Sequence, residues 1–166
     1  MDEYLDLVDV NDTVIGQKLR SEVYAEGLSN FRVINAFIKN SEGKLWIPKR
    51  GPRKRIYPNA LDMSVGGHVE SGEDYDFSFA RETAEELNID TTKVPWKFLG
   101  KCTPHEHGVS AFMHVYEISS DDAPDYNPDD FTESNWLSPK ELRAELESGV
   151  PAKSDLVTLL NIFYPK

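Results

Sequence analysis

The stretch that decides the fold is GGHVESGEDYDFSFARETAEELNI, Gly66 to Ile89. It opens with two glycines and a histidine, and it crowds Glu82, Glu85 and Glu86 together directly after an arginine. Like charges three or four residues apart on a helix cost about 0.2–0.5 kcal/mol per pair. Three acidic side chains on one helical face therefore indicate that a divalent cation supplies the missing positive charge.

The same stretch predicts an amphipathic helix that starts near Ser71. Ser71 and Asp74 form a capping-box pattern, and the acidic residues around them suit the positive end of the helix dipole. Asn88 is a suitable left-handed terminator after the last turn. The three glutamates are expected on the side opposite to the inward-facing stripe. That stripe is predicted at helical spacing: Phe77, Ala80, Ala84 and Leu87.

Carboxylate groups on this helix favour metal-dependent phosphate chemistry. Their oxygens are the hard ligands that Mg²⁺ and Mn²⁺ prefer, and Mg²⁺ commonly shares its shell with substrate phosphates. We expect the spacing of Glu82, Glu85 and Glu86 to place three carboxylates around one point. Arg81 can orient a carboxylate through two parallel hydrogen bonds. The expected reaction class is attack of water on phosphorus.

These residues also carry a family resemblance, because the pattern is similar to the Nudix box, G-x5-E-x7-R-E-U-x-E-E-x-G-U. Two positions depart from it: Thr83 stands where a bulky aliphatic residue is usual, and Asn88 replaces a glycine. Neither departure removes a metal ligand, so they put only local packing in doubt. Six positions agree: Gly67, Glu73, Arg81, Glu82, Glu85 and Glu86.

The resemblance implies a Nudix-type α/β/α sandwich with a mixed β-sheet flanked by helices. It implies Mg²⁺- or Mn²⁺-dependent hydrolysis of a phosphoanhydride bond in a small nucleotide-type substrate. The implied metal ligands are Glu82, Glu85, Glu86 and the carbonyl of Gly67, and the implied catalytic residues are Glu86, Glu85 and Arg81. Arg81 would orient the cluster and Glu73 would brace the junction of loop and helix. The general base varies within the family, so Glu86 or a loop residue could serve. Glu133, three residues before Trp136, is a candidate for a base or an additional ligand.

Outside the box, the sequence predicts one domain over residues 1–166. Residues 1–28 are expected to form a hairpin extension that ends in a short helical turn, residues 66–89 the loop and helix of the box, and residues 139–166 two helices. Strands are predicted at FRVINAFIKN, KLWIPKR, ALDMSV, WKFLGKC, VSAFMHVYEI and NWLS, with TPHEHG as a loop.

Composition restricts the class of partner. The chain has 166 residues and a net charge of −11, which argues against the basic surface that non-specific nucleic-acid binding requires. No apolar run approaches the roughly 20 residues of a membrane span, and the single Cys102 excludes an internal disulfide. We therefore expect a cytoplasmic enzyme, either a monomer or a homodimer.

A local basic cluster opposes the overall charge. Residues 49–55 are a candidate phosphate-binding loop, although a plain surface loop is as well supported. His68 is a further candidate for substrate binding; it could join the metal shell or simply stay in its loop, and between these two we favour the loop. We expect His105 and His107 in a solvent-facing loop at the rim of the site, and the three tryptophans in packing roles. The basic candidates are Lys49, Arg50, Arg53, Lys54 and Arg55.

Two other functions remain open. The N-terminal hairpin and the segment SVGGH are similar to the isopentenyl-diphosphate isomerase branch of the superfamily, but Gly66 stands where that branch has its catalytic cysteine. Glycine cannot supply the acid–base group that isomerisation needs. The third possibility is a non-catalytic binding module on the same fold, which the complete set of box glutamates disfavours.

Overall fold

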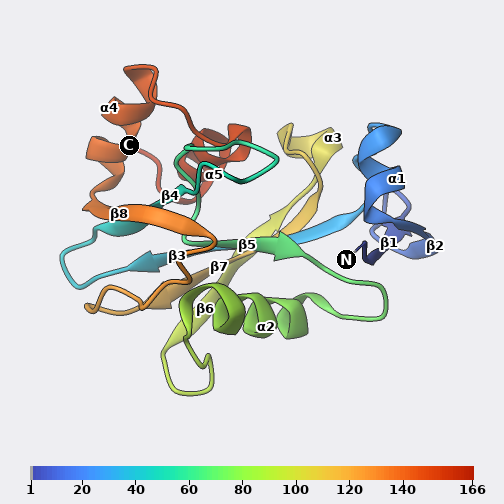
Figure 1. Ribbon diagram of the computed structural model, residues 1–166, viewed down its shortest axis with the longest axis horizontal. Helices are drawn as coiled ribbons and strands as arrows, with labels where there is room; N and C mark the ends of the chain where they lie inside the picture. Colours follow the sequence, from blue (N-terminus) through green and yellow to red (C-terminus); the bar gives the residue numbers. More distant parts are fainter. Residues whose placement is uncertain (1) are drawn as a thin grey trace.

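The computed structural model describes residues 2–166 and consists of a central mixed sheet with helices on both faces (Figure 1). The sheet order is β6-β7-β3-β4-β8, and β5 pairs with β3 off this path. The sheet strands are β3 (Arg32–Lys39), β4 (Leu45–Arg50), β5 (Val65–His68), β6 (Trp96–Cys102), β7 (Phe112–Ser119) and β8 (Phe131–Leu137).

One edge of strand β3 is shared by two partner strands, β5 and β4, which diverge from each other and leave space for a site. Strand β3 pairs with β7 in parallel along its whole length, but its other edge is shared. The first half of that edge pairs with β5, whereas β4 pairs with β3 only at Lys39 and Leu45. Between the diverging strands, the buried hydroxyl of Ser64 accepts a hydrogen bond from Ile38 N (2.9 Å) and donates one to Trp46 O (2.6 Å). The Ser64 side chain thus replaces backbone hydrogen bonds that β3 and β4 do not make with each other here.

Helices cover the two faces through separate apolar clusters. On one face, α2 (Tyr75–Leu87) packs Phe79 and Leu87 against β3. On the other face, α4 (Pro139–Glu147) and α5 (Ser154–Phe163) pack Leu142 and Leu159 against the sheet. Figure 1 shows α2 on one side of the sheet and the two C-terminal helices on the other. The predicted α/β sandwich with a mixed sheet is confirmed.

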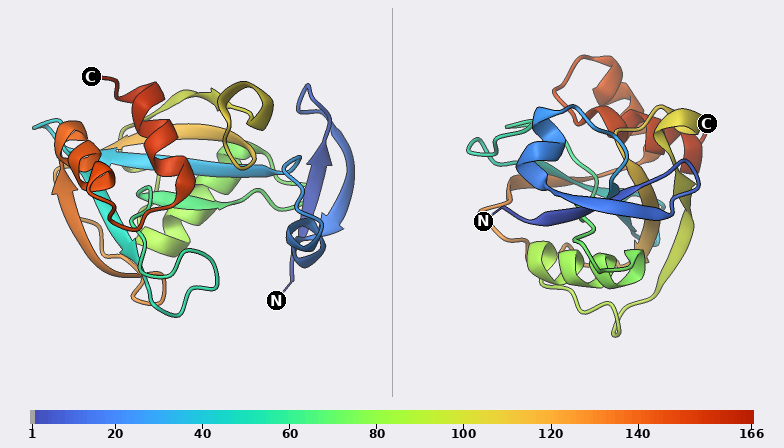
Figure 2. Two further views of the ribbon diagram at one scale, coloured as in Figure 1. Left: turned by 90° about the horizontal axis from the view of Figure 1, so that it is seen from above. Right: turned by 90° about the vertical axis from the view of Figure 1, so that its right-hand side faces the viewer.

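The N-terminal residues form a small unit at one end of the molecule (Figure 2). Its hairpin consists of β1 (Tyr4–Val8) and β2 (Val14–Leu19), and α1 (Arg20–Ala25) follows. The hairpin and the helical turn were both expected. Asp12, in the hairpin turn at φ +63°, accepts hydrogen bonds from Arg32, Lys101 and Tyr75 and so connects the unit to the sheet and to α2.

The box helix differs from the prediction at its start. It begins at Tyr75 with Asp74 as N-cap, whose carboxylate accepts from Phe77 N at 2.8 Å. Ser71 is not a cap, because Gly72 lies at φ +87° between it and the helix, and its hydroxyl instead donates to Asp6 at 2.7 Å. The left-handed terminator at Asn88, with φ +55°, is confirmed.

The predicted inward stripe of α2 is confirmed at Leu87 but is wrong at Phe77 and Ala84. Phe77 is 59% exposed and Ala84 is exposed, because the helix buries the face that carries its small hydroxyl side chains. The buried positions are Tyr75, Ser78, Phe79, Thr83 and Leu87. Apolar spacing alone missed this face, since Ser78 and Thr83 count as polar but pack inward.

Two smaller segments differ as well. The strand expected at ALDMSV begins only at Val65, and Leu61 makes isolated bridges to Lys49 and Ala152 instead. The expected loop TPHEHG contains the short helix α3 (Pro104–His107), capped by Thr103. No helix within residues 2–166 combines the length and apolar character that crossing a bilayer requires.

Candidate active site

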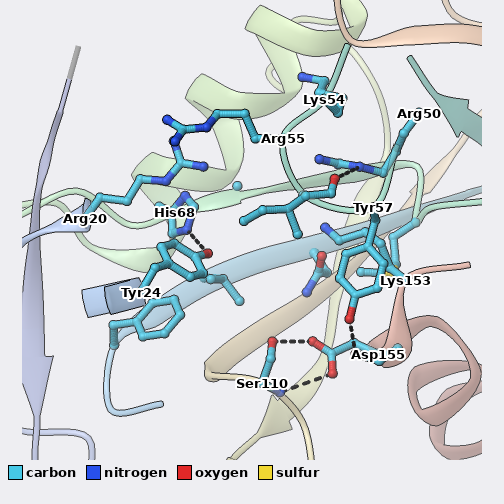
Figure 3. A pocket seen from close by; sticks show the side chains of 18 of the residues that line it. Arg20, Tyr24, Arg50, Lys54, Arg55, Tyr57, His68, Ser110, Lys153 and Asp155 are labelled. Atoms are coloured by element: carbon cyan, nitrogen blue, oxygen red, sulfur yellow. Dashed lines mark hydrogen bonds between the residues drawn. The ribbon is translucent and has the colours of Figure 1, made fainter. Parts of the chain in front are cut away.

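A cavity of about 830 Å³ opens where β3 changes partners (Figure 3). One wall is the box itself, with Gly66, Gly67, Glu82 and Glu86. The N-terminal unit forms a second wall and the basic loop of residues 51–60 a third. Figure 3 shows labelled side chains from the N-terminal unit, the basic loop and β5 around one space. The main cationic lining is Arg20, Arg50, Arg53, Lys54, Arg55 and Lys153.

Arg81 is the hub of the box. Its guanidinium donates to both carboxylate oxygens of Glu73 at 2.8 Å, to Glu82 Oε1 at 2.8 Å and to the carbonyl of His68 at 3.0 Å. The hydrogen bonds to Glu73 and Glu82 raise the pKa of Arg81, which stays charged. The loop before α2 and the first turns of the helix are therefore held by one side chain.

Glu73 is the main anchor for that guanidinium. Its carboxylate also accepts from Ser78 Oγ at 2.8 Å and from Glu70 N at 3.0 Å. Burial by itself would raise the pKa of Glu73, but the hydrogen bonds from Arg81 and Ser78 outweigh burial, and the net pKa is lowered. Glu73 is thus an ionised brace between loop and helix.

Gly67 brings the backbone of β5 against the acidic side chains. A Cβ added at this residue would lie 2.2 Å from Glu82 Cδ, closer than any real contact. The absence of a side chain is what allows the Glu82 carboxylate to lie directly over the strand. Glu82 is consequently only 14% exposed, and burial raises its pKa to about 7.

The orientation of Glu86 differs from the expectation that all three glutamates point away from the core. Its carboxylate faces the cavity and accepts from Gly66 N at 3.1 Å. Burial first, and the nearby charge of Glu82 second, raise its pKa well above the usual range. The outward prediction is wrong because the buried face of α2 is centred on Phe79 and Thr83, and Glu86 lies at the flank of that face.

The three carboxylates do not surround one point, so that expectation is wrong. Glu85 lies on the solvent side, 59% exposed and 3.4 Å from Arg81, whereas Glu82 and Glu86 line the cavity. Within residues 2–166, no three acidic, histidine or cysteine side chains converge in a ready-made metal cage. Of the three box glutamates, Glu82 and Glu86 therefore line the cavity, and Glu85 lies on the solvent side of the helix.

The basic cluster divides between two surfaces. Arg50, Arg53, Lys54 and Arg55 line the cavity, but Lys49 lies outside it and approaches Glu133 at 3.7 Å across the β4–β8 pair. Successive residues of a strand point to opposite faces, which separates Lys49 from Arg50. Glu133 is 66% exposed and also lies off the cavity. Lys49 and Glu133, both candidates from the sequence, therefore do not line the cavity.

His68 is part of the cavity wall, and the prediction that it stays in a loop is wrong. It ends β5, its Nε2 lies 2.7 Å from Tyr24 Oη, and its ring stacks on Phe31. Burial, together with the positive charge of Arg20 and other cations, lowers its pKa to about 3, so the ring is neutral. Neither His105 nor His107 lines this cavity.

Several cavity residues were missed from the sequence. Arg20 and Tyr24 come from the N-terminal unit, Asn35 from β3 and Lys153 from the segment before α5. Figure 3 shows Arg20 and Tyr24 on one side of the cavity and Lys153 on the other. None of them belongs to a recognisable motif, because their proximity results from the packing of distant segments.

Comparison with known proteins identifies the family. Residues 30–160 match the NUDIX domain family. The chain is 58% identical over 162 residues to the Nudix hydrolase all7351 of Nostoc, covering 98% of this chain and 96% of that protein. It is 47% identical over 163 residues to a Nudix hydrolase of Deinococcus radiodurans, covering 98% and 95%.

Solved structures agree with these sequence matches. The crystal structure of DR0079 from Deinococcus radiodurans has a TM-score of 0.93 at 46% identity and covers 98% of this chain and 99% of that one. A MutT protein from Methanosarcina mazei shares the fold with a TM-score of 0.62 at 18% identity, covering 80% and 91%. Because the family match includes the whole loop, helix and sheet of the site, this chain belongs to the Nudix hydrolases, a family of pyrophosphohydrolases.

Proposed function

We propose that this protein is a metal-dependent hydrolase that cleaves a phosphoanhydride bond in a nucleotide-type substrate, either a nucleoside di- or triphosphate or a nucleoside diphosphate linked to another group. One observation carries the proposal: Glu82 and Glu86 line the same cavity as six cationic side chains. Carboxylates suit a metal ion and the cations suit phosphate oxygens, so the two sets are complementary to a metal-bound diphosphate.

The buried carboxylates fit Mg²⁺ or Mn²⁺. The pKa values of Glu82 and Glu86 are raised because both carboxylates are buried and lie near other acidic groups. A bound dication would stabilise their ionised forms. We propose Glu82, Glu86 and the carbonyl of Gly67 as ligands, with Glu85 joining from the outer edge. When bound, the ion polarises phosphate oxygens and makes a bound water more acidic.

The residues around these ligands have supporting roles in this proposal. Arg81 orients Glu82 through its 2.8 Å hydrogen bond, and Glu73 holds Arg81 in place. Glu86 is our candidate for the general base, because its carboxylate faces the cavity and its pKa is raised by burial. The basic loop and His68 line the space where the substrate would bind.

The hydrolase is favoured over an isopentenyl-diphosphate isomerase. The resemblance to that branch lies in the hairpin and in the residues around Gly66, yet Gly66 has no side chain that could exchange a proton with carbon. Cys102 offers no substitute. It is fully buried in β6, does not line the cavity, and burial raises its pKa to about 11.

A substrate panel tests the proposal. Purified protein is incubated with nucleoside di- and triphosphates, nucleoside diphosphates linked to other groups, and isopentenyl diphosphate, each with Mg²⁺, Mn²⁺ or a chelator. We expect phosphate-containing products from at least one nucleotide, only with metal, identified by chromatography and ³¹P NMR. If no substrate of the panel is converted, a non-catalytic binding module is favoured. Formation of dimethylallyl diphosphate from isopentenyl diphosphate would favour the isomerase.

A further inference from the structure

The segment before α5 places a lysine beside the box. Lys153 is the N-cap residue of α5, and its backbone N donates to Leu61 O at 3.0 Å. Leu61 N in turn donates to Pro151 O at 2.9 Å, so this segment is fixed to the chain that leads into β5. The Lys153 side chain lines the cavity and is 24% exposed (Figure 3).

The buried carboxylate of Asp62 pairs with the Lys153 ammonium but does not occupy all three N–H donors of that ammonium. Asp62, only 4% exposed, accepts from Met63 N at 2.7 Å and from Arg50 Nη1 at 3.0 Å, and Lys153 Nζ lies 3.5 Å from its Oδ1. An ammonium group has three donors. Within residues 2–166, no shorter polar contact of Nζ is found, so donors remain free for a ligand in the cavity.

Because Gly66 has no side chain, the Lys153 ammonium lies close to the part of the cavity that contains Glu86. The Gly66 N–H donates to Glu86, while a Cβ added at Gly66 would lie 3.7 Å from Lys153 Nζ and 2.9 Å from Asn35 Oδ1. The ammonium and the Glu86 carboxylate therefore flank the same glycine. A partly desolvated cation opposite a proposed metal ligand is well placed for a phosphate oxygen.

We propose that Lys153 is a substrate-binding residue that contacts the phosphoryl group held against Glu86, and that Asp62 positions it. This inference rests on the proposed hydrolysis of a phosphoanhydride. It adds an anion subsite from the C-terminal segment that is separate from the basic loop of residues 51–60.

Binding of inorganic pyrophosphate tests the subsite. Its affinity is measured by isothermal titration calorimetry in the presence of Mg²⁺ for the wild type, Lys153→Met and Lys153→Arg. Loss of a charge-assisted hydrogen bond predicts that Lys153→Met weakens binding by about 10–100-fold, and Lys153→Arg restores most of it. Lys97→Met is the matched control, because Lys97 pairs at 3.4 Å with the buried Glu117 but lies outside the cavity.

The outcomes separate this inference from the function on which it rests. A wild type that binds no pyrophosphate would contradict the proposed function. Equal binding by the wild type and a folded Lys153→Met variant, with backbone NMR spectra that match, would overturn the role of Lys153 alone. An equal loss of pyrophosphate affinity in Lys153→Met and Lys97→Met would show a general effect of net charge, and it would also overturn the role of Lys153.

Discussion

Glu86 combines two properties that a folded protein normally avoids in one side chain. It is an acidic group in a poorly hydrated position, and its direct partner among residues 2–166 is a backbone amide, Gly66 N. Such a group costs stability unless a cation or a proton neutralises it. Its presence is therefore better explained by ligand binding than by packing.

Replacing Glu86 with glutamine tests this interpretation. The Glu86→Gln side chain keeps an oxygen that can accept from Gly66 N but loses the charge, so we expect at least about a hundredfold lower kcat. The thermal midpoint should stay equal or rise, because a buried charge is removed. Glu145→Gln, on the exposed face of α4, is the control. Unchanged turnover in Glu86→Gln would remove Glu86 from the site.

At the scale of elements, the N-terminal unit supports the box although it lies outside the matched family residues. Asp6 accepts from Ser71 Oγ and Gly72 N in the loop before α2. Asp12 accepts from Lys101 Nζ at 2.6 Å, Tyr75 Oη at 2.7 Å and Arg32 Nε at 2.8 Å. The hairpin thus holds the start of the box helix in place.

The substitution Asp12→Asn tests that connection. Asparagine tolerates the left-handed backbone at this position, so the main loss is the charge that Arg32 and Lys101 share. We expect the free energy of unfolding in urea to fall by about 2–3 kcal/mol. Asp125→Asn, at an exposed loop position, should change it little. An effect no larger than that of the control would mean that the hairpin is not energetically coupled to the sheet.

At the scale of the whole molecule, the charge distribution opposes the net charge. The chain carries −11 overall, yet the cavity gathers cations from α1, β4, the basic loop and the segment before α5. A cavity lined by cations can attract a small anion locally even though the protein as a whole is acidic. We expect Glu82 and Glu86, which line this cavity, to make the stability of the fold depend on pH and on a divalent metal ion.

We expect the metal-free protein to lose stability as pH rises from 5 to 8. The folded pKa of Glu82, about 7, lies above the ordinary 4.5, so its contribution is present at low pH and is lost as pH rises through 7. Glu82 alone accounts for on the order of 3 kcal/mol. Thermal midpoints measured with a chelator should fall over this range, and Mn²⁺ at pH 8 should restore them.

The Glu82→Gln variant is the control for this pH dependence. It should show a flatter profile and a smaller response to Mn²⁺, because its side chain does not ionise. A wild-type midpoint that stays constant between pH 5 and 8 would contradict the raised pKa. A response to Mn²⁺ that is the same in both proteins would place the metal elsewhere.

The sequence by itself determined the family and most of the helices and strands. The spacing from Gly67 to Glu86 identified the box, and turn residues and apolar periodicity located most strands and helices, because these signals act over a few residues. Asn88 ended the helix as expected for the same reason.

Only the tertiary structure decided which side chains share the cavity. It turned Glu82 and Glu86 inward and left Glu85 outside, it separated Lys49 from Arg50, and it brought Arg20 and Lys153 to the box. Local patterns do not encode these outcomes, since they depend on how segments distant in the chain pack across one sheet. The divergence of β4 and β5 along β3 opens the space in which those segments meet.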